Sequence, residues 1–370
     1  MSRILIVTAS FGDGHNTAAR NIREALENEV PGAQVRVVDL YAVTNPRINT
    51  AMKAGYRIAI TRATRLWSAI FRLLDKPGVL ERSLPLIAKM RKNFEKLAAE
   101  FQPAVIVSTY PLYSFLAAEI GKHGRPLNIP LVTVVTDSTE INTAWFRCQS
   151  DAFVVADSAT ADRLTEGGVP PDKIHPLGFP VDLRFEEVTP LSTSVGAPWK
   201  ILFMPSTRRL SAVRTAKSLL ARKDIELTVL TGRSELMRGV FRKHGLDSAR
   251  CRLVGWTDQM PNLLAEHHAF LGKAGGAITQ EAIAAGCPIL IHHVVPGQEE
   301  GNIALLLQHQ MGALANTPEL LRMQVESAFG GDALVWKRWK RNLAAMRNPS
   351  SARAIARFIE RVAQEGVTSP

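Results

Sequence analysis

The sequence has few cysteines and no long hydrophobic run, and each scarcity excludes a class of protein. Its three cysteines are odd in number and widely spaced, so neither a disulfide framework nor a cysteine-ligated zinc site is expected. No apolar stretch approaches the ~20 residues that span a bilayer, and the N-terminus has the pattern of a strand rather than a signal peptide. We therefore expect a cytoplasmic protein, either soluble or attached to a membrane from its cytosolic side.

The sequence also lacks the usual patterns of a catalytic metal site. It contains no Asp-x-Asp pair to hold Mg²⁺ or Mn²⁺ and no HExxH motif. The adjacent His292 and His293 point to opposite faces of a predicted strand, and His267 and His268 have no obvious third ligand. We predict neither a metal ion nor another cofactor.

Charge is the most unusual bulk property. The net charge of +11 implies an acidic partner, which could be nucleic acid, anionic lipid or a phosphate-bearing substrate. Residues 47–96 contain twelve Lys or Arg and three acidic residues, with apolar residues including Trp67 and Phe71 at helical spacing. This segment could lie on an anionic membrane surface through Trp67 and Phe71, or be a core-facing helix with a solvated basic face. Nucleic acid is less favoured, because the aromatic residues fall on the apolar stripe.

The 370 residues suffice for two domains, and each half of the chain alternates apolar strands with helices. The predicted strands are 3–8, 35–38, 104–108, 131–136, 152–156, 200–204, 227–230, 252–254, 269–271 and 289–292. We place an N-terminal domain at 1–185, a linker at 186–198, a second domain at 199–345 and a terminal helical segment at 346–370. This pattern predicts two doubly wound α/β domains, with ligands bound in a cleft at the carboxyl ends of the strands.

A glycine-containing loop, Phe11-Gly12-Asp13-Gly14-His15, follows the first predicted strand and opens a helix. Glycines there permit an unusual turn, and the helix dipole disfavours the protonated form of His15, which suits a neutral general base. Alternatively, His15 only caps the helix and the glycines shape an ordinary strand-to-helix turn.

Asp137 follows another buried strand, within Val135-Thr136-Asp137. Its carboxylate could orient an acceptor hydroxyl or take its proton, or it could cap the next turn. The nearby Trp145-Phe146 pair could line an apolar acceptor pocket or fill the core.

The strongest constellation lies around Gly275-Gly276, where a strand-like run ends in paired glycines that open a helix. Backbone N–H groups at such a helix start bind phosphate without a metal ion. Glu281, one turn later, suits a ribose diol, while Gln298, Glu299 and Asn302 suit sugar hydroxyls. These groups predict a pocket for a sugar nucleotide.

Three further residues extend this pocket. Arg233 and Lys273 could meet the diphosphate charge, and Trp256 could cover a base. Trp256 could equally be a packing residue, and arginines after strands are common.

These motifs resemble those of the diacylglycerol sugar transferases, namely plant-type monogalactosyldiacylglycerol synthases and bacterial processive diacylglycerol glucosyltransferases. A more distant similarity is to the lipid-linked N-acetylglucosaminyltransferase of peptidoglycan synthesis. The resemblance runs from about residue 3 to residue 315, and its most specific parts are Lys273-Ala274-Gly275-Gly276 and Pro296-Gly297-Gln298-Glu299.

The resemblance implies a GT-B fold and an inverting, metal-independent transfer of a hexose from a UDP-sugar to diacylglycerol or a related lipid. It also implies a peripheral enzyme on the inner face of the cell membrane, bound to an anionic surface. By motif position, His15 would be the base and Asp137 would assist it or compete for that role. Gly14 and Trp145 fall among the acceptor-side residues, and Met260 and Thr279 among the donor-binding ones.

One loop departs from the family pattern. Where relatives carry a glycine-rich loop after the first strand of the second domain, this chain has Met204-Pro205-Ser206-Thr207-Arg208-Arg209. Arg208 and Arg209 could replace the lost backbone contacts by charge, or the loop could mark a changed donor or a weakened enzyme. Two other functions therefore stay open, a UDP-sugar epimerase on the same scaffold and a non-catalytic protein that binds UDP-sugar and membrane.

Overall fold

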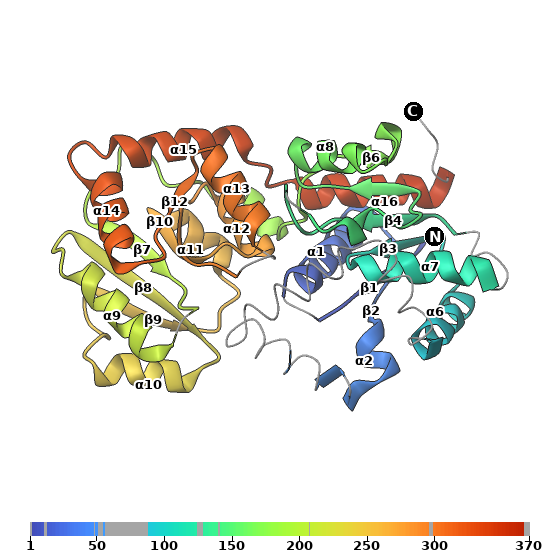
Figure 1. Ribbon diagram of the computed structural model, residues 1–370, viewed down its shortest axis with the longest axis horizontal. Helices are drawn as coiled ribbons and strands as arrows, with labels where there is room; N and C mark the ends of the chain where they lie inside the picture. The colour runs from blue at the N-terminus through green and yellow to red at the C-terminus, as the bar shows by residue number, and fades with distance from the viewer. Residues whose placement is uncertain are drawn as a thin grey trace. The chain divides into compact units, whose positions relative to one another are not determined.

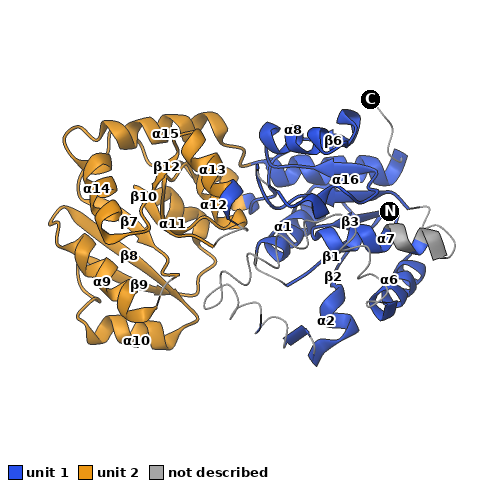
Figure 2. Cartoon of the chain, viewed as in Figure 1, with its two compact units in different colours: residues 1–183, 296–301, 350–370 blue, residues 184–295, 302–349 orange. Residues whose placement is uncertain are grey.

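The computed structural model describes residues 2–10, 13–47, 49–50, 55, 88–123, 129–139, 141–206, 208–295 and 299–365. The chain divides into two compact units, shown in blue and orange in Figure 2. The first comprises Met1–Leu183, Pro296–Gly301 and Ser350–Pro370, and the second comprises Arg184–Val295 and Asn302–Pro349. Each unit is built around its own parallel sheet.

The sheet of the first unit has six strands in the order β2-β1-β3-β4-β5-β6 (Figure 1). The strands are β1 (Arg3–Thr8), β2 (Gln34–Asp39), β3 (Val105–Ser108), β4 (Leu131–Val134), β5 (Ala152–Val154) and β6 (Ile174–His175). The helices are α1 (Asp13–Glu29), α2 (Leu40–Thr44), α6 (Ala88–Phe101), α7 (Pro111–His123), α8 (Ser158–Glu166) and α16 (Ser351–Glu365). The order reverses between β1 and β3, and such a reversal is where ligands bind in open α/β sheets.

The central strand β1 is buried on both faces, which explains its continuous apolar sequence. Ile4 and Ile6 belong to the core cluster that includes residues of α1 and α16, whereas Leu5 and Val7 belong to the cluster that includes residues of α6 and α7. Helix α16 therefore completes the core of the first unit, although 166 residues, 184–349, separate its segment from Leu183. Its Arg353 and Arg357 also pair with Glu29 at the end of α1.

The sheet of the second unit has the order β12-β11-β10-β7-β8-β9, again with every pair parallel. The strands are β7 (Trp199–Phe203), β8 (Ile225–Gly232), β9 (Cys251–Gly255), β10 (Ala269–Lys273), β11 (Ile289–His293) and β12 (Gly312–Leu314). The helices are α9 (Arg209–Leu220), α10 (Glu235–Lys243), α11 (Met260–Glu266), α12 (Gly276–Ala285), α13 (Glu300–Gln308), α14 (Pro318–Phe329) and α15 (Leu334–Met346). Here the order reverses between β10 and β7, so the loops after these strands are the expected ligand site.

The ten strands predicted from the sequence all overlap observed ones, with ends displaced by a few residues. Two strands were missed, β6 and β12, which have two and three residues and are too short to show periodicity. In the basic segment 47–96, the structure describes residues 47, 49–50, 55 and α6 from Ala88 onward. The predicted membrane-contact residues Trp67 and Phe71 lie outside the described residues.

Candidate functional site

His15 lies in the first turn of α1, which follows β1 at the reversal point of the first sheet. Its Nδ1 atom is 2.8 Å from the hydroxyl oxygen of Thr136, just beyond β4. The hydroxyl of Thr109, which follows β3, donates a 3.2 Å hydrogen bond to the backbone carbonyl of His15. Groups that follow the two neighbouring strands β3 and β4 therefore fix both the ring and the backbone of this residue.

Asp137 and Trp145 form a second contact beside His15. The indole Nε1 of Trp145 donates a 2.8 Å hydrogen bond to Asp137 Oδ2. The ring centroids of Trp145 and His15 are 5.9 Å apart, and Tyr110 meets His15 edge-on at 5.1 Å. Trp145 is only 1% exposed, so its ring lies in the core and its one polar atom is directed to Asp137. Trp145, which the sequence suggested as an acceptor contact, thus holds the carboxylate of Asp137 in place.

The electrostatic environment favours a neutral His15. Burial lowers the pKa of His15 below its usual value of 6.5, and the negative charge of Asp137 partly offsets that effect. An imidazole with a pKa below 6.5 is neutral near pH 7 and can accept a proton. The nearby Asp137 stabilises the imidazolium that this transfer creates. This set can therefore perform general-base chemistry on a bound hydroxyl.

A chain of polar side chains holds the segment that leads to His15. Asn16 Oδ1 accepts from the hydroxyl of Thr8 at 3.1 Å, and Asn16 Nδ2 donates to Ser10 at 2.9 Å. Ser10 in turn donates to Asp39, 2.5 Å away, which also caps α2 through the Ala42 N–H. Sequence reasoning singled out neither Asn16 nor Thr136. Asn16 directly follows the quoted loop and Thr136 directly precedes Asp137, but nothing in the sequence assigns either residue a partner.

In the second unit, β10 leads directly into the paired glycines at the start of α12. Gly275 is the N-cap, with φ −71° and ψ 150°, and no side chain caps the helix. The first N–H groups of an α-helix have no partner within it, so this end can bind an anion. Asn302 Nδ2 donates a 3.1 Å hydrogen bond to the carbonyl of Ala274, which fixes the chain immediately before the turn.

Two buried polar atoms near this turn have no hydrogen-bond partner among the described residues. Thr279 is fully buried, and its hydroxyl is one of them. Asn302 is 2% exposed, and its Oδ1 is the other. Buried polar atoms normally have partners, and their absence here suits a site that a polar ligand completes. Lys273 and Glu281 are half-buried on β10 and α12, on either side of the turn.

The remaining predicted donor residues follow β8 and β9. The guanidinium carbon of Arg233 lies 5.0 Å from the ring centroid of Trp256, a cation–π contact between the ends of two neighbouring strands. Trp256 is 64% exposed, so one of its faces is available to a flat ligand. Met260 begins α11, five residues after the end of β9, and is half-buried. These residues and the glycine turn are not adjacent in the sheet, because β7 lies between β10 and β8.

Two predicted sugar-contact residues, Gln298 and Glu299, are not among the residues placed near the glycine turn. Gln298 lies outside the described residues. Glu299 is 3% exposed and belongs to the short segment Pro296–Gly301, which is grouped with the first unit. Gly14 is the second residue of α1, next to His15.

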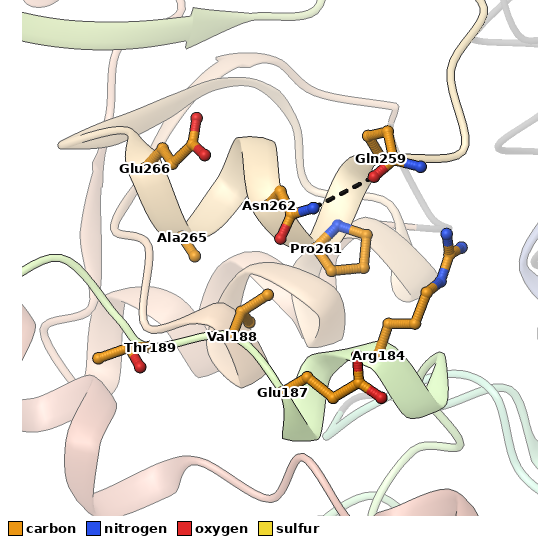
Figure 3. A pocket seen from close by; sticks show the side chains of 9 residues that line it. All are labelled: Arg184, Glu187, Val188, Thr189, Gln259, Pro261, Asn262, Ala265 and Glu266. Atoms are coloured by element: carbon orange, nitrogen blue, oxygen red, sulfur yellow. Dashed lines mark hydrogen bonds between the residues drawn. The ribbon is translucent and has the colours of Figure 1, made fainter.

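A separate pocket opens in the second unit between α11 and the segment after the short 3-10 helix η4 (Leu183–Glu186) (Figure 3). Its volume is about 350 Å³. The lining residues are Arg184, Glu187, Val188, Thr189, Gln259, Pro261, Asn262, Ala265 and Glu266. No predicted site residue is among them. Its side chains are mostly at the surface, and Asn262 and Gln259 bond to each other at 3.1 Å.

Histidines considered as metal ligands have other contacts. His267 is hydrogen-bonded through both ring nitrogens, to the Leu263 carbonyl at 2.6 Å and to Thr228 at 2.9 Å. His268 accepts the backbone N–H of Lys200 at 3.0 Å. Among the described residues, no cluster of three or more His, Cys, Asp or Glu could hold a metal ion.

Within the part of the chain that the structure describes, no helix is both long enough and apolar enough to cross a membrane.

Solved structures with two such units show the same fold. S. aureus MnaA with UDP aligns with a TM-score of 0.66 at 12% identity, over 100% of this chain and 99% of that one. MurG of Acinetobacter baumannii gives a TM-score of 0.62 at 11% identity, over 98% and 100% of the two chains. The fold is therefore of the GT-B type, with two Rossmann-like units, as predicted.

Sequence relatives indicate a particular family among proteins with this fold. The family model described as monogalactosyldiacylglycerol (MGDG) synthase matches residues 15–181. A processive diacylglycerol beta-glucosyltransferase of Bacillus licheniformis is 22% identical over 364 residues, covering 95% of this chain and 93% of that protein. Monogalactosyldiacylglycerol synthase 3, chloroplastic, of Arabidopsis thaliana is 24% identical over 390 residues, covering 98% and 82%. The chain is therefore similar to the diacylglycerol glycosyltransferases over nearly all of its length, as its motifs indicated.

Proposed function

We propose that this protein transfers a hexose from a UDP-sugar to diacylglycerol or a related lipid, with inversion and without a metal ion. The observation that carries the proposal is His15, an imidazole with a lowered pKa, fixed by Thr136 and adjacent to Asp137. It lies at the reversal point of a parallel sheet, where ligands of such folds bind. The sequence relatives, named as transferases that act on diacylglycerol, support the choice of acceptor.

His15 deprotonates the lipid hydroxyl as its oxygen attacks the anomeric carbon of the donor. The bond from that carbon to the UDP oxygen breaks on the opposite side, so one displacement inverts the configuration. Negative charge develops on the departing diphosphate. The uncapped N–H groups at the start of α12, with Lys273 close by in sequence, are suited to stabilise it.

The remaining donor contacts follow from the chemistry of each residue. Glu281 accepts from the ribose hydroxyls, and Gln298, Glu299 and Asn302 bind the sugar. The buried Thr279 hydroxyl, which has no partner in the described part of the chain, bonds to the phosphate or ribose. The exposed face of Trp256 stacks on the base, with Arg233 behind it.

The acceptor is insoluble in water, so the enzyme works at a membrane surface. Residues 47–96, with twelve basic and three acidic residues, dock on anionic lipid on the inner face of the cell membrane. Sedimentation with anionic vesicles tests this step. Binding at low salt that is lost at high salt supports it, and protein that stays in solution at low salt contradicts it.

The central test combines radiolabelled UDP-glucose or UDP-galactose with vesicles that contain diacylglycerol. Wild-type protein should produce a labelled lipid, and His15→Ala should lower the rate by about 10²–10⁴-fold. UDP binding by calorimetry should persist in His15→Ala, because the proposed donor residues lie on other elements. Full activity in His15→Ala would remove this residue from the mechanism.

A UDP-sugar epimerase is the second candidate, since a UDP-N-acetylglucosamine 2-epimerase structure shares this fold with a TM-score of 0.61 at 14% identity. That reaction needs no lipid. Conversion of a UDP-sugar in the absence of diacylglycerol would favour it. Tight UDP-sugar binding without any turnover over a broad lipid panel would instead indicate a non-catalytic binding protein.

A further inference from the structure

Thr136 is the residue that contacts the imidazole of His15. Its hydroxyl oxygen is 2.8 Å from His15 Nδ1, and the residue is 3% exposed. In the motif Val135-Thr136-Asp137, the sequence indicates the carboxylate of Asp137, rather than Thr136, as the functional group. In the structure, the carboxylate oxygen Oδ2 of Asp137 instead accepts the indole N–H of Trp145 at 2.8 Å.

The position of this hydroxyl bears on which ring nitrogen can act as a base. A neutral imidazole carries one N–H donor and one nitrogen with a lone pair, and a hydroxyl can accept from the first or donate to the second. Nδ1 of His15 is occupied by Thr136, so Nε2 is the nitrogen that remains for a substrate hydroxyl. Nε2 can accept a proton only when the ring proton resides on Nδ1.

We propose that Thr136 is a positioning residue that holds neutral His15 with its proton on Nδ1, donated to the Thr136 oxygen, so that Nε2 keeps its lone pair. This inference rests on the proposed role of His15 as the base. It assigns to a hydroxyl the orienting role that a carboxylate has in a Ser-His-Asp triad. Asp137 acts instead through its charge, which favours the imidazolium.

The proton balance follows from this assignment. The proton of the acceptor hydroxyl moves to Nε2 while the oxygen forms its bond to the anomeric carbon and UDP departs. The ring then carries protons on both nitrogens, with Nδ1–H still directed to Thr136. Loss of the Nε2 proton to water restores the starting tautomer.

Nitrogen NMR of the full-length protein labelled with ¹⁵N-histidine reports the tautomer directly and needs no substrate. The His15 signals are assigned by their loss in His15→Gln. We expect a protonated Nδ1 and an unprotonated Nε2 near pH 7 in the wild type. In Thr136→Val, which keeps the shape and removes the hydroxyl, the proton should shift toward Nε2.

Thr133 offers a matched control on the same segment. It is fully buried on β4, and its hydroxyl bonds to Ser114 and Ser150, each at 2.6 Å. Thr133→Val therefore removes a buried hydroxyl without touching His15. It should lower stability and leave the His15 tautomer unchanged.

Kinetics supply a second readout. Thr136→Val should lower kcat by about 10-fold or more, with the KM for UDP-sugar within about twofold, because the hydroxyl orients the base and does not bind the donor. Thr136→Ser, which keeps the hydroxyl, should restore kcat to within about threefold of the wild type. If Thr136→Val does not fold, the wild-type tautomer and the Thr136→Ser variant still decide the question.

The outcomes separate the two proposals. A wild-type His15 protonated on Nε2, or a Thr136→Val variant with unchanged tautomer and kcat, overturns the role of Thr136 and leaves His15 as a base. Undiminished transfer by His15→Ala overturns the proposed function, whatever tautomer the ring adopts.

Discussion

The side-chain amide of Asn302 donates a 3.1 Å hydrogen bond to the backbone carbonyl of Ala274, so a residue of α13 fixes the chain just before the Gly275-Gly276 turn. The turn has no side-chain cap of its own. We therefore expect this remote contact to restrain the turn and the direction of its N–H groups.

Asn302→Ala should weaken UDP binding. Loss of one buried hydrogen bond costs about 1–2 kcal/mol, which corresponds to an affinity loss of about 5–30-fold. Calorimetry with UDP measures it. Asn342→Ala is a suitable control, because Asn342 also donates to backbone carbonyls, those of His309 and Gln310, but at the surface of α15. Equal UDP affinity in Asn302→Ala and the wild type would show that the turn does not need this contact.

Trp145→Phe should lower the rate of lipid glycosylation while leaving UDP affinity unchanged. The variant keeps a ring in the core and removes the indole N–H that holds Asp137. We expect kcat to fall by about 10-fold, a typical effect of misplacing a charged group beside a base.

Trp336→Phe is the matched variant for this experiment. Trp336 is fully buried and donates its indole N–H to the His268 carbonyl at 2.7 Å, in the second unit. It should lose stability to a similar extent without a specific fall in kcat. If both variants lose the same fraction of kcat, the effect on Trp145 is only structural.

The pH dependence of kcat/KM should report the lowered pKa of His15. In the proposed mechanism the neutral ring is the base, so activity rises with pH through this pKa, with an inflection below pH 6.5. The charge of Asp137 raises the pKa, so any residual activity of Asp137→Asn should have its inflection at lower pH than the wild type. A rate profile at constant ionic strength measures both. An inflection above pH 6.5 would contradict a buried neutral base.

Stability should fall on acidification because of His267 and His268. Burial lowers the pKa of each to about 4. The unfolded chain binds these protons near pH 6.5, so between about pH 6.5 and pH 4 it holds more protons than the fold does. The contribution is fully present above pH 6.5, and each histidine should remove about 1–3 kcal/mol by pH 4.

Urea unfolding at several pH values tests this expectation. His268→Gln should flatten the dependence, and the exposed His309→Gln is its control. A wild-type stability that is constant from pH 6.5 to pH 4.5 would refute the assignment of these two residues as buried neutral groups.

The order of strands and helices could be derived from the sequence, because each unit is a parallel sheet covered on both faces. The run Arg3–Thr8 is apolar throughout for this reason, and it forms β1 as predicted. The strands β6 and β12 were missed because two or three residues carry no period. The glycine turn at Gly275 could also be located, since only a strand-to-helix junction combines these residue types.

The roles of individual side chains were decided by tertiary structure. Trp145 could have lined an acceptor pocket, but its burial and its bond to Asp137 place it within the core. The role of Thr136 cannot be predicted from the sequence, because strand propensity alone explains a β-branched residue at the end of a strand. Its distance to His15 depends on pairing between strands that lie more than a hundred residues apart.

Local sequence therefore determined which strands and helices form and which residue types each of them presents. Hydrophobic periodicity and turn-forming residues depend on a few neighbouring residues, so strands, helices and turns can be predicted from the sequence. Hydrogen-bond partners and pKa shifts depend on groups that only the folded sheet brings within 3 to 6 Å. For that reason the tautomer of His15, the support of Asp137 and the bracing of the glycine turn by Asn302 became apparent only in three dimensions.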